Sequence, residues 1–139
     1  MAQYSRRSKD YLATCHLDIQ ILFKAVIEDG YDHTVICGYR EEEAQTAAYE
    51  SGASKVQWPN GKHNKFPSEA IDVIPYNRGI DWTDELAIAA FAGKVLATAN
   101  RLYKEHQMHH RVRWGGDWDM DGKTKDQRFN DLVHFELVM

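Results

Sequence analysis

Apolar residues recur at helical spacing in two long stretches of the chain. Residues 10–29 place large apolar side chains on one face at a period near 3.6, and Gly30 follows as a stop signal. The second stretch starts at Thr83, which can cap a helix, and continues to about His106 with apolar residues on one face and small ones over much of the rest. The pattern predicts two amphipathic helices, and we expect the second to be central to the fold.

Short apolar stretches rich in β-branched residues lie between these helices and after them. Such stretches are typical of strands, and a proline stops the second of them. The predicted strands are residues 33–39, 70–75, 112–114 and 132–138. Residues 40–50 are rich in helix formers and precede a long polar loop over 51–68. This order of elements predicts an α+β fold in which a small antiparallel sheet packs against helices.

Size and composition indicate one ordinary globular domain. The chain has 139 residues with neither an internal repeat nor a linker, so we expect a single domain over residues 1–139. Hydrophobic residues make up 43% of the chain, and the net charge of −4 gives no bulk attraction to nucleic acid or to anionic membranes. No apolar stretch approaches the roughly 18 residues of a membrane span. We therefore expect neither nucleic acid nor a membrane as a partner.

The N-terminal residues and the two cysteines bear on location. The basic residues near the start are followed by no apolar segment, so we expect no signal peptide and a cytoplasmic location. Because the cytosol keeps thiols reduced, we expect Cys15 and Cys37 to be free.

Three residues far apart in the sequence, His63, Asp72 and His134, suit metal binding. Asp72 lies in an otherwise apolar strand, where an unpaired carboxylate is costly and metal ligation removes that cost. Two imidazoles and one carboxylate leave the fourth position of tetrahedral zinc free for water. A further carboxylate, Asp131, lies three residues before His134 and can take the proton of that water. These residues predict a small zinc hydrolase with its metal site on the sheet and the adjoining loop.

Other polar residues have more than one interpretation. Glu136 shares a strand face with His134 and can either orient that ligand or replace Asp131 as the base. His106 and His110 have the spacing of a helical zinc motif, but the glutamate that such a motif needs after its first histidine is missing. For these two histidines we predict a solvated helix end.

The acidic segment Asp117, Asp119 and Asp121, followed by Gly122, matches the start of a calcium loop. Three carboxylates at alternate positions supply hard oxygen ligands. The twelfth position counted from Asp117 is Arg128, where a calcium loop has a bidentate glutamate. Two interpretations stay open, a weak regulatory Ca²⁺ site and an acidic turn without a metal.

Four motifs follow one another along the chain. They are Gly38-Tyr39-Arg40 with Gln45, His63 with Ser68-Glu69-Ala70-Ile71-Asp72, Trp114-Gly115-Gly116-Asp117-Trp118, and Asp131-Leu132-Val133-His134-Phe135-Glu136-Leu137. With these motifs in this order, the chain resembles the zinc D-Ala-D-Ala-type peptidases. That group includes the vancomycin-resistance dipeptidases and the phage endolysins that cut the L-Ala–D-Glu bond of peptidoglycan. The resemblance extends from about Tyr4 to Val138.

The resemblance implies a role for each matching residue. His63, Asp72 and His134 match the three zinc ligands of the family, so it implies Zn²⁺ as the cofactor. Asp131 matches the catalytic carboxylate three residues before the last ligand. The substrate that the resemblance implies is the stem peptide of peptidoglycan.

Arg40 matches the arginine that polarises the scissile carbonyl and stabilises the oxyanion in this family. Removal of such an oxyanion donor costs on the order of 10²–10³ in rate. The alternative is an ordinary ion pair of Arg40 with Glu43 or Glu69.

The chain departs from the family pattern around the first ligand. Ser68 stands where the family commonly has glycine, and Gly61 stands where it has serine. The step from His63 to Asp72 is nine positions, whereas the family usually has seven, so residues 64–67 hold about two extra residues. We expect this insertion to reshape the loop over the metal on the substrate side more than the ligation itself.

The leading hypothesis is a zinc-dependent peptidoglycan peptidase of the phage endolysin type, which cuts the L-Ala–D-Glu bond and lyses the host cell. We expect a monomer without a separate cell-wall-binding domain, held in the host cytoplasm until a holin releases it to the periplasm. One alternative is a D-Ala-D-Ala carboxypeptidase or dipeptidase with the same chemistry. The other is a non-catalytic, zinc-stabilised module that binds wall peptides.

Overall fold

The computed structural model describes residues 2–139, and Met1 lies outside the described part of the chain. Its elements in chain order are α1 (Arg6–Ala13), α2 (Leu17–Glu28), β1 (His33–Cys37), α3 (Glu42–Glu50), the short 3-10 helix η1 (Lys62–Asn64), β2 (Ala70–Pro75), α4 (Glu85–Lys104), β3 (Arg111–Gly115) and β4 (Asp131–Val138). The four strands form one antiparallel sheet in the order β1-β2-β4-β3. The predicted α+β class is confirmed.

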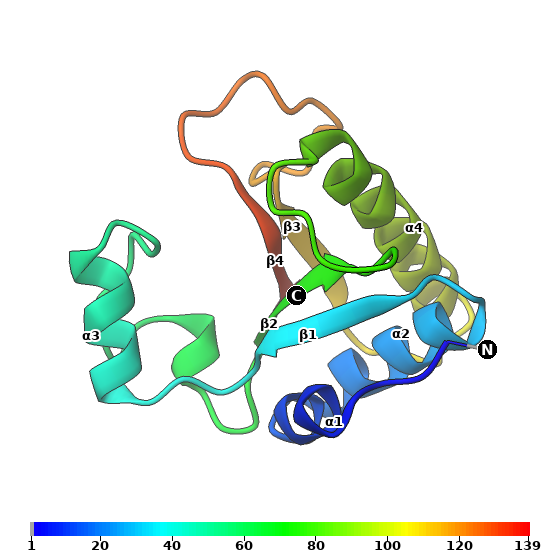
Figure 1. Cartoon of the computed structure of the whole chain (residues 1–139), viewed down its shortest axis with the longest axis horizontal. Helices are drawn as coiled ribbons and strands as arrows, with labels where there is room; N and C mark the ends of the chain where they lie inside the picture. The colour runs from blue at the N-terminus through cyan, green and yellow to red at the C-terminus, as the bar shows by residue number, and fades with distance from the viewer. Residues whose placement is uncertain (1) are drawn as a thin grey trace.

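The helices α2 and α4 lie side by side against the sheet and enclose the core (Figure 1). Helix α4 contacts α2 and the strands β2, β3 and β4, which confirms the central place predicted for it. Phe23 of α2 and Phe135 of β4 meet edge to face with their ring centroids 5.8 Å apart. Helix α3 and the segment after it stand apart from these helices, beyond the strands (Figure 1). The sheet therefore keeps one face for the core and another beside α3.

The single helix predicted over residues 10–29 is wrong, because the structure forms two helices there. The chain leaves α1 at Thr14, and α2 begins after His16, whose Nδ1 accepts a hydrogen bond from the Asp18 N–H at 3.0 Å. Between the helices the backbone bonds to a distant residue, since the Ser68 N–H donates to Thr14 O and the His16 N–H donates to Ser68 O, both at 2.8 Å. These long-range bonds replace helical ones, and apolar periodicity does not reveal them.

Helix α4 is also shorter than predicted at both ends. Asp84 caps it in place of Thr83, because the Asp84 side chain accepts a hydrogen bond from the first helical turn. The helix ends at Lys104, and the backbone of His106 has a positive φ of 63°. His106 is exposed just past the end of α4, as predicted, whereas the prediction is wrong for His110, which lies near β3 and binds Asp18.

The sheet register places Asp72 of β2 directly opposite His134 of β4. On β2, the neighbouring Ile71 and Val73 are buried in the core. Because strand side chains alternate between faces, Asp72 points to the opposite face. The same alternation on β4 turns Phe135 into the core and His134 toward Asp72. Two predicted metal ligands are thus neighbours because of strand pairing.

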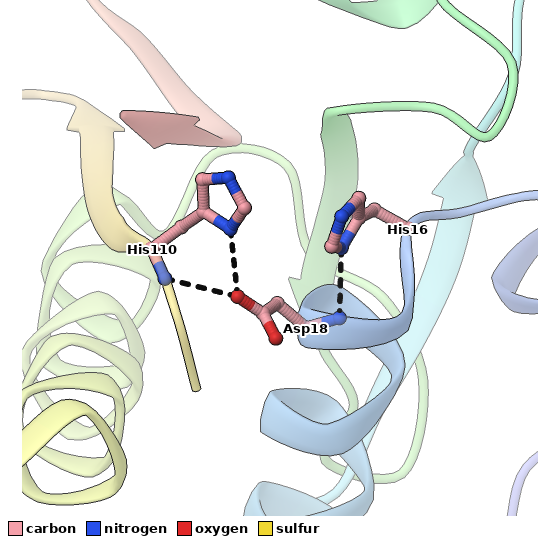
Figure 2. Close-up of side chains that lie close together, drawn as sticks. All are labelled: His16, Asp18 and His110. Carbon is pink, nitrogen blue, oxygen red and sulfur yellow. Dashed lines mark hydrogen bonds and ion pairs between the residues drawn. The ribbon is translucent and has the colours of Figure 1, made fainter. Parts of the chain in front are cut away.

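A polar cluster of His16, Asp18 and His110 joins the start of α2 to the start of β3 (Figure 2). Asp18 is buried, and its Oδ2 accepts hydrogen bonds from the His109 N–H at 2.8 Å, the His110 N–H at 3.0 Å and His110 Nδ1 at 2.8 Å. The rings of His16 and His110 meet edge to face, 5.0 Å between centroids. Because three donors already occupy Oδ2 and the His16 ring caps α2, these contacts make the cluster a structural tie.

We expect Asp18→Ala to lower the free energy of unfolding by about 2–3 kcal/mol, because it leaves the N–H groups of His109 and His110 without their acceptor. Urea unfolding measures this loss, and Glu28→Ala, which removes an exposed carboxylate from the same helix, is the control. Equal stability of the two variants would contradict a structural role for Asp18.

The stability that Asp18 contributes should depend on pH. Burial alone would raise the pKa of the Asp18 carboxyl, but the hydrogen bonds from His110 and from the His109 N–H lower it below the ordinary value. A lowered pKa stabilises the fold above about pH 4 and ceases to do so as the pH falls through the lowered value. The stability difference between wild type and Asp18→Ala should therefore shrink in acid.

Candidate active site

A cavity of about 600 Å³ lies between strand β4, the segment after α3 and the loop that leads into β4. Its walls include every residue that the sequence predicted for catalysis or zinc binding: Arg40, His63, Asp72, Asp131 and His134. Trp82, Trp118 and Phe129 add aromatic surface to the same cavity. The fold thus brings residues that are up to 94 positions apart to one concave surface.

Three chain segments direct one donor atom each toward a common point. His63 lies on η1, Asp72 on β2 and His134 on β4. The Nε2 of His63 and the Nδ1 of His134 each lie 3.2 Å from Oδ1 of Asp72. Both imidazoles are buried, and the Asp72 side chain is 13% exposed. The two nitrogens thus flank one carboxylate oxygen in the cavity. Residues with metal-binding spacing form two groups that share Asp72, one with Cys37 and His63 and the other with Asp131 and His134.

The outer nitrogen of each imidazole has its own partner. His63 Nδ1 lies 2.7 Å from the Gly38 carbonyl, which can only accept, so this nitrogen carries a proton. His134 Nε2 lies 2.8 Å from Oε1 of Glu136. These contacts leave His63 Nε2 and His134 Nδ1 facing Asp72 Oδ1, an arrangement that suits a metal site whose histidines are oriented by outer acceptors.

The donor set fits zinc, which takes imidazole nitrogen and carboxylate oxygen in tetrahedral sites. Cys37 is a further potential ligand near His63 and Asp72, which the sequence did not indicate. Its Sγ lies 3.8 Å from His63 Nδ1, the nitrogen that already bonds Gly38, so it sits on the outer side of the ring. His134 is the better third ligand because its free nitrogen is aimed at Asp72. Cys15 and Cys37 are not bonded to each other.

Electrostatics favour a cation at this point. Burial alone would lower the pKa of His63, but the Asp72 carboxylate raises it to about 10. Burial would raise the pKa of Asp72, yet the two histidines hold it far below its ordinary value. The site therefore attracts positive charge strongly. A metal ion bound there would compete with protons and release them.

Asp131 is the first residue of β4 and lies on the cavity wall beside the predicted ligands. Its Oδ2 is 3.9 Å from His134 Nδ1, and its side chain is 27% exposed. Burial, together with the nearby charge of Asp72, raises the pKa of Asp131 to about 6. A bound cation acts in the opposite direction and favours the carboxylate. Asp131 also has metal-binding spacing with Asp72 and His134, so its oxygen lies where it can act either as a base or as a ligand.

Arg40 is held at the cavity by two side chains. Its Nη2 donates to Asp72 Oδ2 at 3.2 Å and its Nη1 donates to Gln45 Oε1 at 3.1 Å. The Arg40 N–H also donates to the carbonyl of His63 at 2.8 Å. The alternative ion pairs predicted with Glu43 or Glu69 are not formed in the described chain.

A charged network behind His134 was only partly indicated by the sequence. Glu136 faces the same side as His134, and its Oε2 accepts a hydrogen bond from Arg113 Nη2 at 2.6 Å. Lys62 Nζ lies 3.9 Å from the same oxygen and donates to the carbonyl of Leu137. Burial alone would raise the pKa of Glu136, but His134 and Arg113 lower it to about 2. The sequence did not indicate Arg113 and Lys62 as partners of Glu136, because only strand register and loop folding bring them to it.

The structure accounts for the departures around the first ligand. A Cβ on residue 61 would lie 2.7 Å from Oδ1 of Asn64, so a side chain there would displace the Asn64 amide that accepts the Gly61 N–H. Ser68 is fully buried and its hydroxyl donates to Ala70 O at 2.7 Å. Residues 65–67 are exposed. The inserted residues therefore extend toward solvent, and the contacts between His63 and Asp72 are kept.

The acidic loop before β4 is closed by its own hydrogen bonds. Asp117 accepts from the N–H groups of Asp121 at 3.2 Å and Gly122 at 2.8 Å. Asp117, Asp119 and Asp121 nevertheless lie close enough for one cation. Asp121 raises the pKa of the neighbouring Asp126 carboxyl to about 6. Both interpretations of this loop, a weak Ca²⁺ site and a metal-free turn, agree with these contacts.

We expect calorimetric titration of Ca²⁺ into the zinc-loaded protein to show a dissociation constant no tighter than about 1 mM, because the loop has no bidentate glutamate at its end. Asp119→Asn, which removes one exposed carboxylate of the cluster, is the matched variant. Lysis of permeabilised cells with and without a calcium chelator tests whether such binding affects activity. Micromolar affinity that Asp119→Asn abolishes would contradict this expectation.

Comparison with known proteins shows which family model the sequence matches and which solved structure shares its fold. The sequence model of a family described as phage L-alanyl-D-glutamate peptidase matches residues 1–138. No curated protein sequence matches the chain. Among solved structures, the chain is similar to the crystal structure of Serratia marcescens L-Ala D-Glu endopeptidase ChiX. The TM-score is 0.72 and the identity 21%, with 97% of this chain and 89% of that chain covered, which shows a shared fold.

Proposed function

The chain belongs to the phage L-alanyl-D-glutamate peptidase family, and from this premise we propose that it is a zinc enzyme whose metal is held by His63, Asp72 and His134. It is a peptidase of the phage endolysin type, acting on the L-Ala–D-Glu bond of peptidoglycan. The observation that carries the zinc proposal is the convergence of His63 Nε2 and His134 Nδ1 on Asp72 Oδ1, each at 3.2 Å.

Zinc, when bound, supplies a Lewis acid that lowers the pKa of a water molecule toward ~7 and polarises a carbonyl oxygen. The Asp131 carboxylate takes a proton from the attacking water, which makes the water a nucleophile toward the scissile carbonyl carbon. The same carboxyl group then returns the proton to the leaving amine as the C–N bond breaks. Its position beside the ligands supports this role, because a base must lie within hydrogen-bond reach of the water or one water away.

Arg40 is proposed to stabilise the oxyanion that forms on the scissile carbonyl. Its guanidinium lines the cavity and is fixed by Asp72 and Gln45, so little reorganisation is needed when negative charge develops. A non-catalytic binding module has no need of a free carboxylate and a fixed guanidinium beside its metal. Asp131 and Arg40 therefore favour an enzyme over such a module.

Glu136 is proposed as a positioning residue for His134. We expect Glu136→Gln to lower zinc affinity or turnover 10–100-fold, because the carboxylate that orients the imidazole and pairs with Arg113 is lost. Zinc competition with a chelator, and turnover at saturating zinc, separate the two effects. Glu28→Gln, an exposed change on α2, is the control. An unchanged zinc affinity together with unchanged turnover would show that His134 is oriented without Glu136.

Mass spectrometry of digested muropeptides tests the bond that is cut. We expect muramyl-L-Ala ends and free D-Glu amino groups in digests by the zinc-loaded protein, and neither product after chelation. Release of terminal D-Ala instead would assign the carboxypeptidase alternative. Absence of both products with purified peptidoglycan and bound zinc would overturn the proposed activity.

We further propose that the protein works as a single-domain monomer, held in the host cytoplasm until a holin gives it access to the periplasm. Among the described residues, none of the helices has the length and apolarity needed to cross a bilayer. Size-exclusion chromatography with light scattering tests the monomer. Fractionation of infected cells before and after holin triggering tests the location.

A further inference from the structure

Cationic side chains in the active-site cavity differ in whether an acidic group neutralises them. The four are Arg40, Lys55, Lys62 and Arg113. Arg40 pairs with Asp72 at 3.2 Å, while Arg113 and Lys62 lie 2.6 and 3.9 Å from Glu136. Over residues 2–139, no ion pair of Lys55 with a carboxylate is formed. Lys55 therefore brings to the cavity a positive charge that no carboxylate of residues 2–139 neutralises.

Lys55 lies at the end of an aromatic wall that begins at the proposed metal ligands. The ring of Trp118 is 5.5 Å from the ring of His134, and Phe129 stacks on Trp118 at 6.2 Å with an interplanar angle of 11°. The ammonium of Lys55 lies over the Phe129 ring, 5.3 Å from its centroid. The contacts from His134 through Trp118 and Phe129 to Lys55 thus form a continuous surface along which a short extended peptide can lie.

The backbone around Lys55 is fixed although its side chain is exposed. Gln45 is buried, and its Nε2 donates to Ser54 Oγ at 3.0 Å and to Val56 O at 2.7 Å, on either side of Lys55. The Oε1 of Gln45 accepts from Arg40, so the same side chain ties this segment to the oxyanion residue. Lys55 is thus presented from a defined point of the cavity rim.

The peptidoglycan stem peptide carries carboxylates that can pair with Lys55. Cleavage at L-Ala–D-Glu leaves the glutamyl residue with a carboxylate that is not part of the scissile amide, and the next residue of the stem can carry another. We propose that Lys55 is a specificity-determining residue that binds a substrate carboxylate on the D-Glu side of the scissile bond. This inference rests on the function proposed above. A charge-assisted hydrogen bond of this kind contributes about 1.5–3 kcal/mol, or roughly tenfold or more in binding.

Steady-state kinetics on three synthetic stem peptides tests the inference with the zinc-loaded protein. One peptide has free carboxylates, one has the glutamyl carboxylate as an amide, and one has the carboxylate of the following residue as an amide. Lys55→Met keeps the apolar stem over Phe129 and removes the charge, Lys55→Arg restores a charge, and Lys65→Met removes an exposed charge from the same connection between α3 and β2.

We expect Lys55→Met to lower kcat/KM on the free peptide about tenfold through KM, with kcat nearly unchanged, and Lys55→Arg to recover most of it. The amide peptide that lacks the bound carboxylate should lose the same factor with wild type and nothing further with Lys55→Met, which identifies the carboxylate. Lys65→Met should match wild type. Equal loss by Lys55→Met on all three peptides, or no loss on any, overturns the role of Lys55 while the peptidase activity stands. Failure of wild type to cut the free peptide overturns the proposed function instead.

Discussion

His134→Ala will leave the protein without its zinc and reduce peptidase activity by at least about 10³-fold. The substitution removes one of three donors and leaves only His63 and Asp72 at the common point. A metal that acts as a Lewis acid supplies several kcal/mol of transition-state stabilisation, and each 1.36 kcal/mol is a factor of ten in rate. Metal analysis of the purified wild type should give about one zinc per chain, and His134→Ala well below that.

The control for this experiment is His109→Ala. His109 is exposed, and only its backbone N–H makes a contact with Asp18, so the same substitution there should keep both zinc and activity. Thermal unfolding of His134→Ala in the presence of a chelator separates loss of metal from loss of fold. Full zinc content and full activity in His134→Ala would remove His134 from the ligand set, and Cys37 would then be the next residue to test.

Asp131→Asn will keep zinc and lose most of its turnover, about 10²–10⁴-fold. The amide has nearly the shape of the carboxylate but cannot take the proton of the attacking water, and general base catalysis contributes a factor of this size. Because Asp131 Oδ2 lies 3.9 Å from His134 Nδ1, outside the closest contacts of the three donors, zinc content should not change. Turnover of the free stem peptide, and metal analysis of the same sample, measure both quantities.

The control is the same substitution at an exposed aspartate. Asp10→Asn on α1 should match wild type in both turnover and zinc content. The kinetic pattern is informative, since loss of a group that acts in the chemical step lowers kcat and kcat/KM together. If Asp131→Asn loses its zinc, then Asp131 is a ligand and the base must be sought elsewhere, with Glu136 as the first choice. Activity within a few-fold of wild type would exclude Asp131 as the base.

The sequence predicted elements well where local pattern and burial agree. The strand at 70–75 occurs with the predicted limits, because its apolar residues are bounded by a proline and lie in the middle of the sheet. Helix boundaries were predicted less well. The break between α1 and α2 depends on hydrogen bonds to Ser68, more than 50 positions away, and nothing in the apolar period of residues 10–29 records that contact.

The sequence alone determined which chemical groups are available. Two histidines, two aspartates and an arginine of the right types stand in recognisable motifs, and their chemistry is a property of the side chains themselves. The sequence identifies all five as site candidates, and they line one cavity: Arg40, His63, Asp72, Asp131 and His134. Their individual roles remain predictions for the experiments above.

Only the tertiary structure decided how those groups are oriented and what supports them. Strand pairing sets Asp72 opposite His134. The contacts of His63 with Gly38 and of His134 with Glu136 select which nitrogen of each imidazole faces Asp72. The unpaired charge of Lys55 likewise appears only when Arg113 and the other cavity cations are seen to have partners. Distances and partners between segments far apart along the chain arise from packing and strand register, which local sequence patterns do not encode.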